Sequence, residues 1–274
     1  MKGSGWRQLG FNHPLLFGLD NEGSTIYLAA GNGLIEASLR GVKWKILTGG
    51  DVTELRDVAV DHNSPGTIYF AHSHGIRVSH DRGATWRELS AGLHRKFTEA
   101  LRVDRLKAGV LLAGGEEGLF RSDNGGVTWK PAGASGFQIS HIEQSPHDAC
   151  EWIATTQAGG LFASTNCGKS FENFRNRVGV DSNLYDAAFD PFDANRIAVV
   201  GWGVGVVISE DHGKTWQTRN AGQAVSIAFD PNQKGRLYVS LHDEALYVSN
   251  DYGKNWTKAG LEGTAVSRMR FVPK

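Results

Sequence analysis

The sequence predicts an all-β fold, a β-propeller of four-stranded antiparallel blades, and three observations support it. One short motif returns five times along the chain. The copies recur roughly every 40 to 45 residues, the length of one four-stranded propeller blade. Between them, short β-branched and aromatic runs alternate with Gly, Pro, Asn and Asp, and no comparable stretch has helical periodicity.

The repeated motif reads Ser-x-Asp/Asn-x-Gly-x-Thr/Ser/Asn-Trp/Phe. Its five copies are SHDRGATW (79–86), SDNGGVTW (122–129), STNCGKSF (164–171), SEDHGKTW (209–216) and SNDYGKNW (249–256). A sixth, decayed copy ends at Trp44, where Leu39 replaces the acidic residue and Gly41 remains.

Each repeated position of the motif has a structural task. The acidic or amide side chain can accept hydrogen bonds from backbone N–H groups of its own turn, and the glycine supplies a positive φ. The aromatic residue then begins the outer strand as a large apolar anchor between blades. The residues with these tasks are Asp81, Asn124, Asn166, Asp211 and Asp251, followed by Trp86, Trp129, Phe171, Trp216 and Trp256. The motif is therefore expected to stabilise the fold.

The motif resembles the Asp-box, or bacterial neuraminidase repeat, of sialidases, xyloglucanases, sortilin-type receptors and the photosystem II assembly factor. The resemblance spans nearly the whole chain and implies a propeller. Because these families share the box and not a chemistry, the resemblance implies no single function. One further phrase, GWGVG from Gly201 to Gly205, is similar to a phrase of the photosystem II assembly factor.

Six complete repeats fit within residues 1–274, which we expect to form a single propeller domain. A strand-like phrase is left over at each end, GWRQLG from Gly5 to Gly10 and VSRMRFV from Val266 to Val272. We expect these two strands to pair in a reduced seventh blade, which would remove an exposed sheet edge. A six-bladed ring with strapping termini, or a fragment of a longer propeller, fits the same sequence.

The composition narrows the class of partner. Twenty-nine basic and 29 acidic residues balance, so no net field attracts nucleic acid, and no window reaches the roughly 20 apolar residues of a membrane span. We expect a soluble monomer without a cofactor. The N-terminus lacks the apolar run of a signal peptide, so the chain reads as cytoplasmic as written, or as secreted or periplasmic if a signal has been trimmed. Cys150 and Cys167 are expected to be partly buried thiols.

The loops of a propeller lie on two faces. With strands called A to D from the centre outward, the Asp-boxes are C/D turns and share a face with the A/B turns. The B/C and D/A loops lie on the opposite face, where loops can vary without disturbing the blades. We therefore expect the ligand site at that mouth of the central channel.

Histidines, carboxylates and one tryptophan are concentrated in the predicted B/C and D/A loops. The candidate catalytic residues are Glu116, Glu117, Asp243 and Glu244, because carboxyl groups on facing loops can act as acid and base. The candidate binding residues are His72, His74, His94, Trp202 and His242. No metal site is predicted, and His72 and His242 are only weak candidates for metal ligands. The B/C-loop members of this set are expected to ring one opening.

Two function classes fit the sequence. A non-catalytic binding or scaffold propeller, recognising a protein, peptide or glycan on the B/C and D/A loop face, is favoured because the Arg-Ile-Pro motif and arginine triad of sialidases are not found. The chain also holds one propeller, whereas xyloglucanases pair two across a cleft. The alternative is a carbohydrate-active glycoside hydrolase or lyase with its site at the channel mouth.

Overall fold

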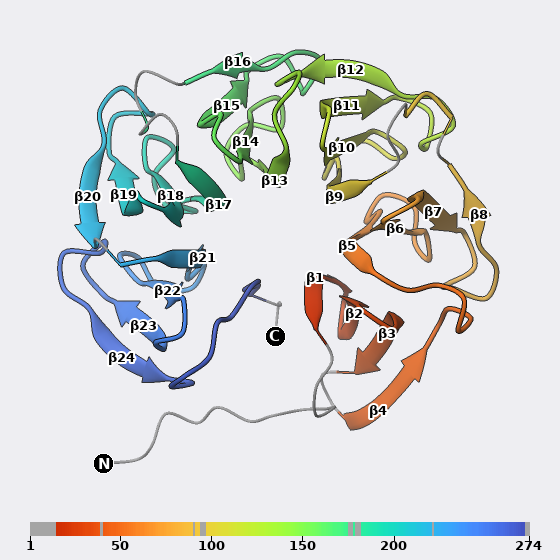
Figure 1. Ribbon diagram of the computed structural model, residues 1–274, viewed down its shortest axis with the longest axis horizontal. Helices are drawn as coiled ribbons and strands as arrows, with labels where there is room; N and C mark the ends of the chain where they lie inside the picture. The colour runs from red at the N-terminus through yellow and green to blue at the C-terminus, as the bar shows by residue number, and fades with distance from the viewer. Residues whose placement is uncertain are drawn as a thin grey trace.

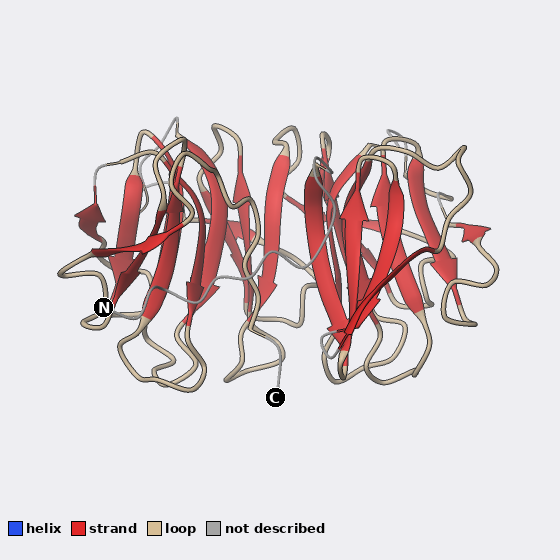
Figure 2. Ribbon diagram, turned by 90° about the horizontal axis from the view of Figure 1, so that it is seen from below, coloured by secondary structure: helices blue, strands red, loops and turns tan. Residues whose placement is uncertain are grey.

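The computed structural model describes residues 15–38, 41–89, 91–93, 97–174, 178, 182–220 and 222–271. Six four-stranded antiparallel sheets surround a central axis, and each sheet is one blade (Figure 1). The strands run between two faces that carry the loops (Figure 2). The predicted all-β propeller is confirmed. In the described part of the chain, no helix is long and apolar enough to cross a membrane.

Blades 1 to 3 follow one another along the chain. Blade 1 contains β1 (Leu16–Glu22), β2 (Thr25–Ala30), β3 (Gly33–Ser38) and β4 (Gly41–Ile46). Blade 2 contains β5 (Leu55–Val60), β6 (Ile68–His72), β7 (Gly75–Ser79) and β8 (Arg87–Glu88). Blade 3 contains β9 (Thr98–Val103), β10 (Leu111–Gly115), β11 (Gly118–Ser122) and β12 (Lys130–Gly133).

Blades 4 to 6 repeat the same order. Blade 4 contains β13 (Ile139–Gln144), β14 (Trp152–Thr156), β15 (Leu161–Ser164) and β16 (Glu172–Asn173). Blade 5 contains β17 (Asn183–Phe189), β18 (Ile197–Trp202), β19 (Gly205–Ser209) and β20 (Gln217–Asn220). Blade 6 contains β21 (Ala224–Phe229), β22 (Leu237–Leu241), β23 (Leu246–Ser249) and β24 (Thr257–Gly260). The first strand of each blade lies innermost (Figure 1).

The hydrophobic core lies between neighbouring blades. Between blades 2 and 3, Tyr69, Leu101 and Trp129 belong to one buried cluster. Comparable clusters fill the other four junctions from blade 1 to blade 6. Because both faces of a middle strand are covered, β6, β10 and β14 are buried at every position, so these repeats read as continuous apolar runs.

The Asp-box of blade 2 shows how the motif builds its turn. Ser79 Oγ donates to Asp81 Oδ1 and accepts from the backbone N–H of Gly83, both at 2.7 Å. Asp81 accepts from the backbone N–H of Thr85 at 2.8 Å and from its hydroxyl at 2.6 Å. Gly83 has a φ of 84°, and a Cβ there would lie 2.8 Å from Leu47 of blade 1. The same bonds to the motif serine and to Asp or Asn recur around Asn124, Asn166, Asp211 and Asp251.

The aromatic residue of each box anchors its blade to the blade before it. Three indole N–H groups donate to a backbone carbonyl of the preceding blade. These pairs are Trp86 with Leu47, Trp129 with Leu89 and Trp256 with Arg219, at 3.2, 2.9 and 3.2 Å. Trp216 packs against the core between blades 4 and 5, and Phe171 is buried between blades 3 and 4. In these blades the motif thus closes its own turn and contacts the blade before it.

The A/B turns and the Asp-boxes share one face, as predicted. In blade 2, the backbone N–H of Arg82 in the box donates to the Gly66 carbonyl in the A/B turn at 3.0 Å. Equivalent bonds join Gly125 to Gly109, Cys167 to Cys150, His212 to Asn195 and Tyr252 to Gly235. In blade 4 a disulfide bond between Cys150 and Cys167 reinforces this contact. The expectation of two thiols is wrong, because the repeat places both cysteines opposite each other.

The junction between blade 6 and blade 1 differs from the other five. These two blades are more widely separated in Figure 1 than any other neighbours, and the segment that follows β24 passes between them. Residues 264–271 of this segment form no strand, so the strand expected over 266–272 is not seen in its described part. The other strand of the expected seventh blade, residues 5–10, lies outside the described residues. The described structure is a six-bladed ring.

Candidate ligand site in the central channel

Aspartates on three of the innermost strands join a blade to the next one along the chain. Asp57 of β5 accepts the backbone N–H of Leu101 in β9 at 3.0 Å. In the same way, Asp186 of β17 accepts from Ile227 in β21 at 3.1 Å. Both aspartates follow a β-bulge, a device that redirects a side chain from its regular position. A third bond of this kind runs from Val60 to Asp20 at 2.9 Å.

Close approach of two inner strands is possible because Gly18 has no side chain. A Cβ at Gly18 would lie 2.6 Å from both the Cα and the Oδ1 of Asp57. Any larger residue would therefore push β1 away from β5. The glycine fixes the position of Asp57 at the channel wall.

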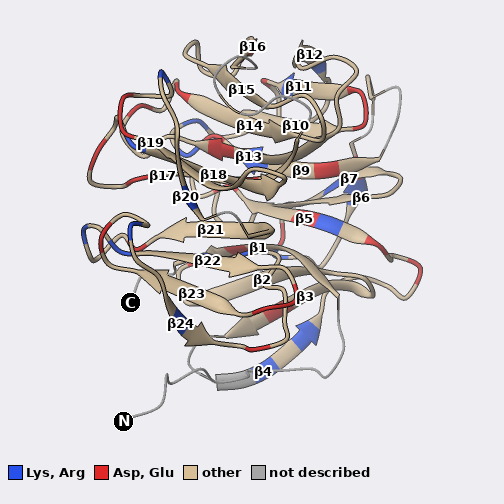
Figure 3. Ribbon diagram, turned by 60° about the vertical axis from the view of Figure 1, so that its left-hand side comes forward, with Lys and Arg blue, Asp and Glu red and all other residues tan. Residues whose placement is uncertain are grey.

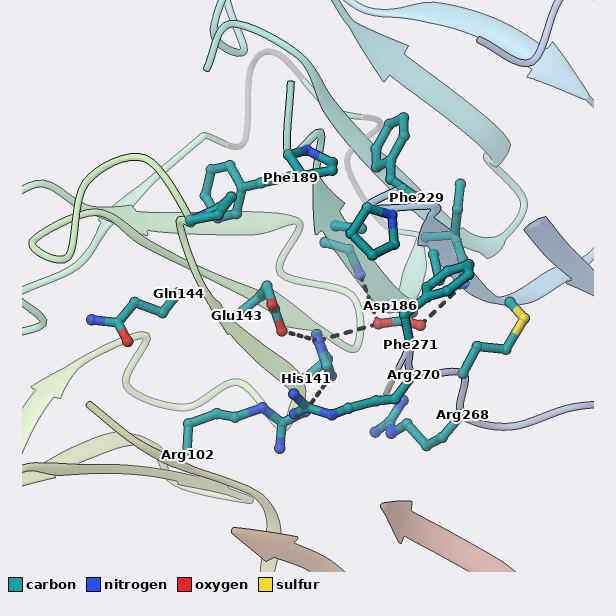
Figure 4. A pocket seen from close by; sticks show the side chains of 18 of the residues that line it. Arg102, His141, Glu143, Gln144, Asp186, Phe189, Phe229, Arg268, Arg270 and Phe271 are labelled. Atoms are coloured by element: carbon teal, nitrogen blue, oxygen red, sulfur yellow. Dashed lines mark hydrogen bonds and ion pairs between the residues drawn. The ribbon is translucent and has the colours of Figure 1, made fainter. Parts of the chain in front are cut away.

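A buried polar network crosses the channel wall from blade 2 to blade 5. Arg102 donates to Asp57 at 2.6 Å, and both side chains are buried. The other terminal nitrogen of Arg102 lies 3.4 Å from Nδ1 of His141. On its far side, His141 Nε2 lies 3.2 Å from Asp186 and 3.4 Å from Glu143. Figure 3 shows charged residues on the inner strands β5 and β9, and Figure 4 shows the contacts of His141.

The network fixes the charge and tautomer of His141. Burial lowers the pKa of His141 despite the neighbouring Asp186 carboxylate, so the ring is neutral near pH 7. Because an arginine can only donate, Nδ1 must be the acceptor, and Nε2 carries the hydrogen that faces Asp186 and Glu143. Burial opposes ionisation of Glu143, but the hydrogen bond from His141 and the charges of Arg270 and Arg102 lower its pKa.

A cavity of 340 Å³ opens beside this network, towards the face that carries the A/B turns. All six blades and the C-terminal segment line it, including Pro146, Pro191 and Pro231 from the A/B turns. Figure 4 shows Arg102, Arg268 and Arg270 converging near His141, with Phe189, Phe229 and Phe271 around them. Charged groups and aromatic rings thus meet in one partly enclosed space.

The C-terminal segment, residues 264–271, reaches blades 6, 1 and 4. On blade 6, Val266 pairs through its backbone with Ser240 and Ser226. On blade 1, Ser267 Oγ donates to the Leu16 carbonyl at 2.8 Å. Arg268 and Arg270 continue into the channel, with contacts that extend to blade 4.

The mouth on the B/C and D/A side has its own polar residues. The guanidinium of Arg56 lies 4.9 Å from the Phe17 ring centroid and 5.1 Å from that of Phe97, a stacked arrangement that favours a cation. Nearby, burial raises the pKa of the Glu99 carboxyl, and the positive charges of Arg56 and Arg268 oppose this rise. A carboxyl group with a raised pKa can hold a proton and donate it.

The structure divides the B/C-loop candidates into three groups and places none of them among the residues that line the 340 Å³ channel cavity. His72 is buried beside Glu88 at 3.9 Å, and His74 lies next to it with ring centroids 5.9 Å apart. Glu116 and Glu117 line a separate pocket with Pro131 and Ser135 on blade 3. His94 lies outside the described residues.

The third group brings residues of blades 5 and 6 together. The rings of Trp202 and His242 meet edge to face, 5.8 Å between centroids, and Trp202 is 44% exposed. Asp243 lies 3.0 Å from His242, and Glu244 accepts a hydrogen bond from Tyr247 at 3.0 Å. Among the described residues, no group of three or more His, Cys, Asp and Glu could hold a metal ion.

Sequence reasoning missed the channel residues, although a signal existed. Asp57 and Asp186 each stand four residues before the aspartate that follows their inner strand, within largely apolar runs. The equivalent place in blade 4 holds His141. A polar residue at one repeated position of a buried strand indicates an inward-facing site, but only an alignment of all six inner strands reveals it.

Two family models match single repeats. A BNR-Asp box repeat is found at residues 246–259, and a BNR/Asp-box repeat at residues 207–218. No curated protein matches the sequence.

Solved structures share the fold at low sequence identity. A GH74 enzyme of Niastella koreensis is 17% identical with a TM-score of 0.73, covering 89% of this chain and 45% of that one. The GH74 xyloglucanase of Xanthomonas campestris is 19% identical with a TM-score of 0.71, covering 89% of this chain and 45% of that one. YCF48 from Cyanidioschyzon merolae is 15% identical with a TM-score of 0.71, covering 95% of this chain and 89% of that one. The chain thus spans about half the length of the GH74 proteins. The described chain is therefore a six-bladed β-propeller that carries BNR/Asp-box repeats at residues 207–218 and 246–259.

Proposed function

We propose that this chain is a non-catalytic binding propeller that recognises a protein, peptide or glycan on the face of the B/C and D/A loops. The observation that carries this proposal is the exposed pair of Trp202 and His242, called here the Trp202 platform, which spans blades 5 and 6. A large exposed aromatic ring held by a neighbour is a surface on which a sugar ring or an apolar side chain can stack. Loops of this face can vary without disturbing the blades.

A binding role also fits how the channel carboxylates are used. Hydrolysis of a glycosidic bond usually needs two carboxyl groups that flank the bond. Asp20, Asp57 and Asp186 instead accept backbone N–H groups of adjacent blades, so their oxygen atoms serve the fold. A propeller of the same fold, YCF48, has been solved bound to a D1 peptide, at 15% identity to this chain and a TM-score of 0.70. Peptide recognition is therefore a role that this fold can perform.

The Trp202 platform can be tested with two arrays, one of glycans and one of peptides. Titration calorimetry would then measure the ligands that bind. Trp202→Ala should lower the affinity for a ligand of the Trp202 platform by about tenfold or more, because the stacking surface is lost. The melting temperature should stay unchanged. Phe192→Ala is the matched control, since Phe192 is 43% exposed in an A/B turn on the opposite face. Equal affinity in both variants would place the ligand elsewhere.

A glycoside hydrolase or lyase is the second candidate, and Glu99 favours it. The raised pKa of Glu99 at the channel mouth is what a proton donor requires. Glu116, Glu117, Asp243 and Glu244 stay predictions for the partner carboxylate. Xyloglucan and other soluble polysaccharides, assayed for new reducing ends, would test this candidate. Activity that is lost in Glu99→Gln would favour the enzyme, whereas the absence of any Glu99-dependent cleavage would favour the binding role.

We further infer that residues 5–10 act as the outer strand of a seventh position in the ring. Trp6-Arg7-Gln8-Leu9 matches Trp86-Arg87-Glu88-Leu89, and Trp86 seals the junction between blades 1 and 2. Deleting residues 1–10 would remove this proposed strand and expose the sheet edge that it covers. The deletion should therefore lower the melting temperature and promote oligomers. Calorimetry and light scattering would measure both effects. A deletion variant that stays monomeric with unchanged stability would contradict this role.

A further inference from the structure

Residues 264–271 lie across the ring as an extended peptide would lie in a binding groove. The segment forms no strand, although it passes beside β21 and β1 (Figure 1). A blade strand is held by a ladder of backbone pairs, as β21 is by β22. From Ser267 onward, the polar contacts of this segment to the blades are made by its side chains. Such contacts can be exchanged without opening a sheet.

Arg268 is recognised by acceptors on the channel wall. One terminal nitrogen donates to the carbonyl of Ser140 in β13 at 3.0 Å, which places the guanidinium beside blade 4. Its positive charge also opposes the rise that burial causes in the pKa of Glu99, a half-buried residue of β9. The carbonyl of Ser140 is thus an acceptor for a cation that carries several hydrogens.

Arg270 is recognised in a similar way by blade 1. Its Nε donates to the carbonyl of Leu19 at 3.1 Å, and a terminal nitrogen lies 3.8 Å from Asp20. The charge of Arg270 also helps to keep Glu143 ionised. The two arginines stand two positions apart, so in an extended chain both side chains point to the same side. Here that side faces the acceptors of the channel.

Apolar residues of the segment fill a groove against blade 6. Met269 and Phe271 line this second cavity of 340 Å³ together with Tyr238 and Leu246. The rings of Phe271 and Tyr238 lie 5.9 Å apart between centroids. The fit is incomplete, because Phe271 is 37% exposed and space remains on both sides of the segment.

We propose that the channel and this groove form a binding site for an extended basic peptide of a partner protein, with two arginines one residue apart followed by an aromatic residue. Residues 264–271 occupy the site in the free chain and compete with that partner. The site lies apart from the Trp202 platform, and each can stand without the other. Each guanidinium group of such a peptide is planar and carries several N–H donors. The carbonyl and carboxylate oxygens of the site can accept hydrogen bonds from these donors.

The first test uses a fluorescent peptide with the sequence of residues 264–271 as the probe. Anisotropy would measure its binding to the full chain and to the variant R268S/R270S, in which the tail competes poorly. The variant should bind the probe about tenfold more tightly than the unmodified chain, since an intramolecular competitor reduces apparent affinity. A probe with both arginines replaced by serine should lose about tenfold or more in affinity. Equal binding by the two chains, or by the two probes, would overturn the proposal.

Two control variants check that the probe binds in the channel. R87S/R236S removes two arginines that lie outside the channel and should behave as the unmodified chain. Trp202→Ala should leave probe binding unchanged. A loss of probe binding in Trp202→Ala would move the peptide to the Trp202 platform and overturn the channel assignment.

A second test avoids any folding defect of R268S/R270S. A protease site inserted after Glu262, which is exposed, allows the tail to be cut after the full chain has folded. The released tail should exchange with the added probe on dilution while circular dichroism stays unchanged, and the serine probe should not replace it. A tail that stays bound through dilution, or whose loss unfolds the ring, would assign residues 264–271 to the fold alone.

Discussion

Blades 2 and 3 meet in a different way from blades 6 and 1. Between blades 2 and 3, Tyr69 is 1% exposed, and the indole of Trp129 donates to the Leu89 carbonyl at 2.9 Å. Tyr238 holds the place of Tyr69 in blade 6, but it is only partly buried, and Phe271 is the ring that meets it. The repeated junctions therefore derive their stability from close packing of the repeat itself. The last junction depends on a segment that does not belong to the repeat.

The largest expected effect of this difference is on core packing. Trp129→Ala should lower the free energy of unfolding by about 3 to 5 kcal/mol, because it removes a buried aromatic side chain and leaves a cavity. Phe271→Ala should cost less than Trp129→Ala, since its ring is already over one third exposed. Urea unfolding at equilibrium would measure both losses. Equal losses would mean that the last junction is packed as well as the others.

The disulfide bond gives an intermediate effect at the A/B-turn face of blade 4. The bond closes a loop with a sequence separation of 17, and the constraint it places on the unfolded chain is worth about 2 to 4 kcal/mol. C150S/C167S, or reduction by dithiothreitol, should lower the stability by this amount. Blades 2, 3, 5 and 6 keep the same backbone hydrogen bond without a disulfide, so their turns serve as internal references in hydrogen exchange. Unchanged protection in blade 4 would contradict the prediction.

The smallest expected effect distinguishes Asp-boxes that carry a charge from those that do not. Hydrogen bonds from the Thr215 side chain and backbone lower the pKa of Asp211 to about 2. The side chains of Thr85 and Asn255 act in the same way on Asp81 and Asp251, with the same pKa of about 2. The unfolded values are higher, near 3.8, so the unfolded chain binds more protons and stability falls as the pH drops from about 4 to 2.

Asp211→Asn tests this pH dependence against a partner already present in the chain. Asn124 holds the same turn without a charge, accepting from the backbone N–H of Thr128 at 2.9 Å. The substitution should flatten the slope of unfolding free energy against pH between about 4 and 2, with little change near neutral pH. Asn124→Asp is the converse variant and should steepen that slope. Slopes that are the same in all three chains would contradict the role of the carboxylate.

The sequence could predict the blades because their signal is local and repeated. Ser79, Asp81 and Gly83 contact one another within one turn, so their spacing alone specifies the geometry. The pairing of A/B turns with Asp-boxes follows from blade topology and was also predictable. The disulfide bond was within reach of the same argument, because Cys150 and Cys167 fill positions joined in the other blades.

The channel network could not be read in this way. Asp57, Arg102, His141 and Asp186 come from four blades, and each blade contributes its own residue to the contact. Their proximity depends on the closure of the ring, which no local pattern encodes. The Trp202 platform is an intermediate case, because its residues lie in predicted loops of adjacent blades while the loops of more distant blades stay apart.

The junction between blades 6 and 1 also sets the order of events during synthesis. Ser267 contacts Leu16 across 251 positions of the chain, and Arg268 contacts Ser140 across 128. The other five junctions join neighbours in sequence and can form as each blade leaves the ribosome. At roughly 5 to 20 residues per second, the first blade then waits more than about ten seconds for its last neighbour. During that interval Leu19 of blade 1 lacks its neighbours Met269 and Phe271, with which it lines one cavity in the folded ring. Nascent chains of this protein should therefore depend on chaperones most while the ring is open.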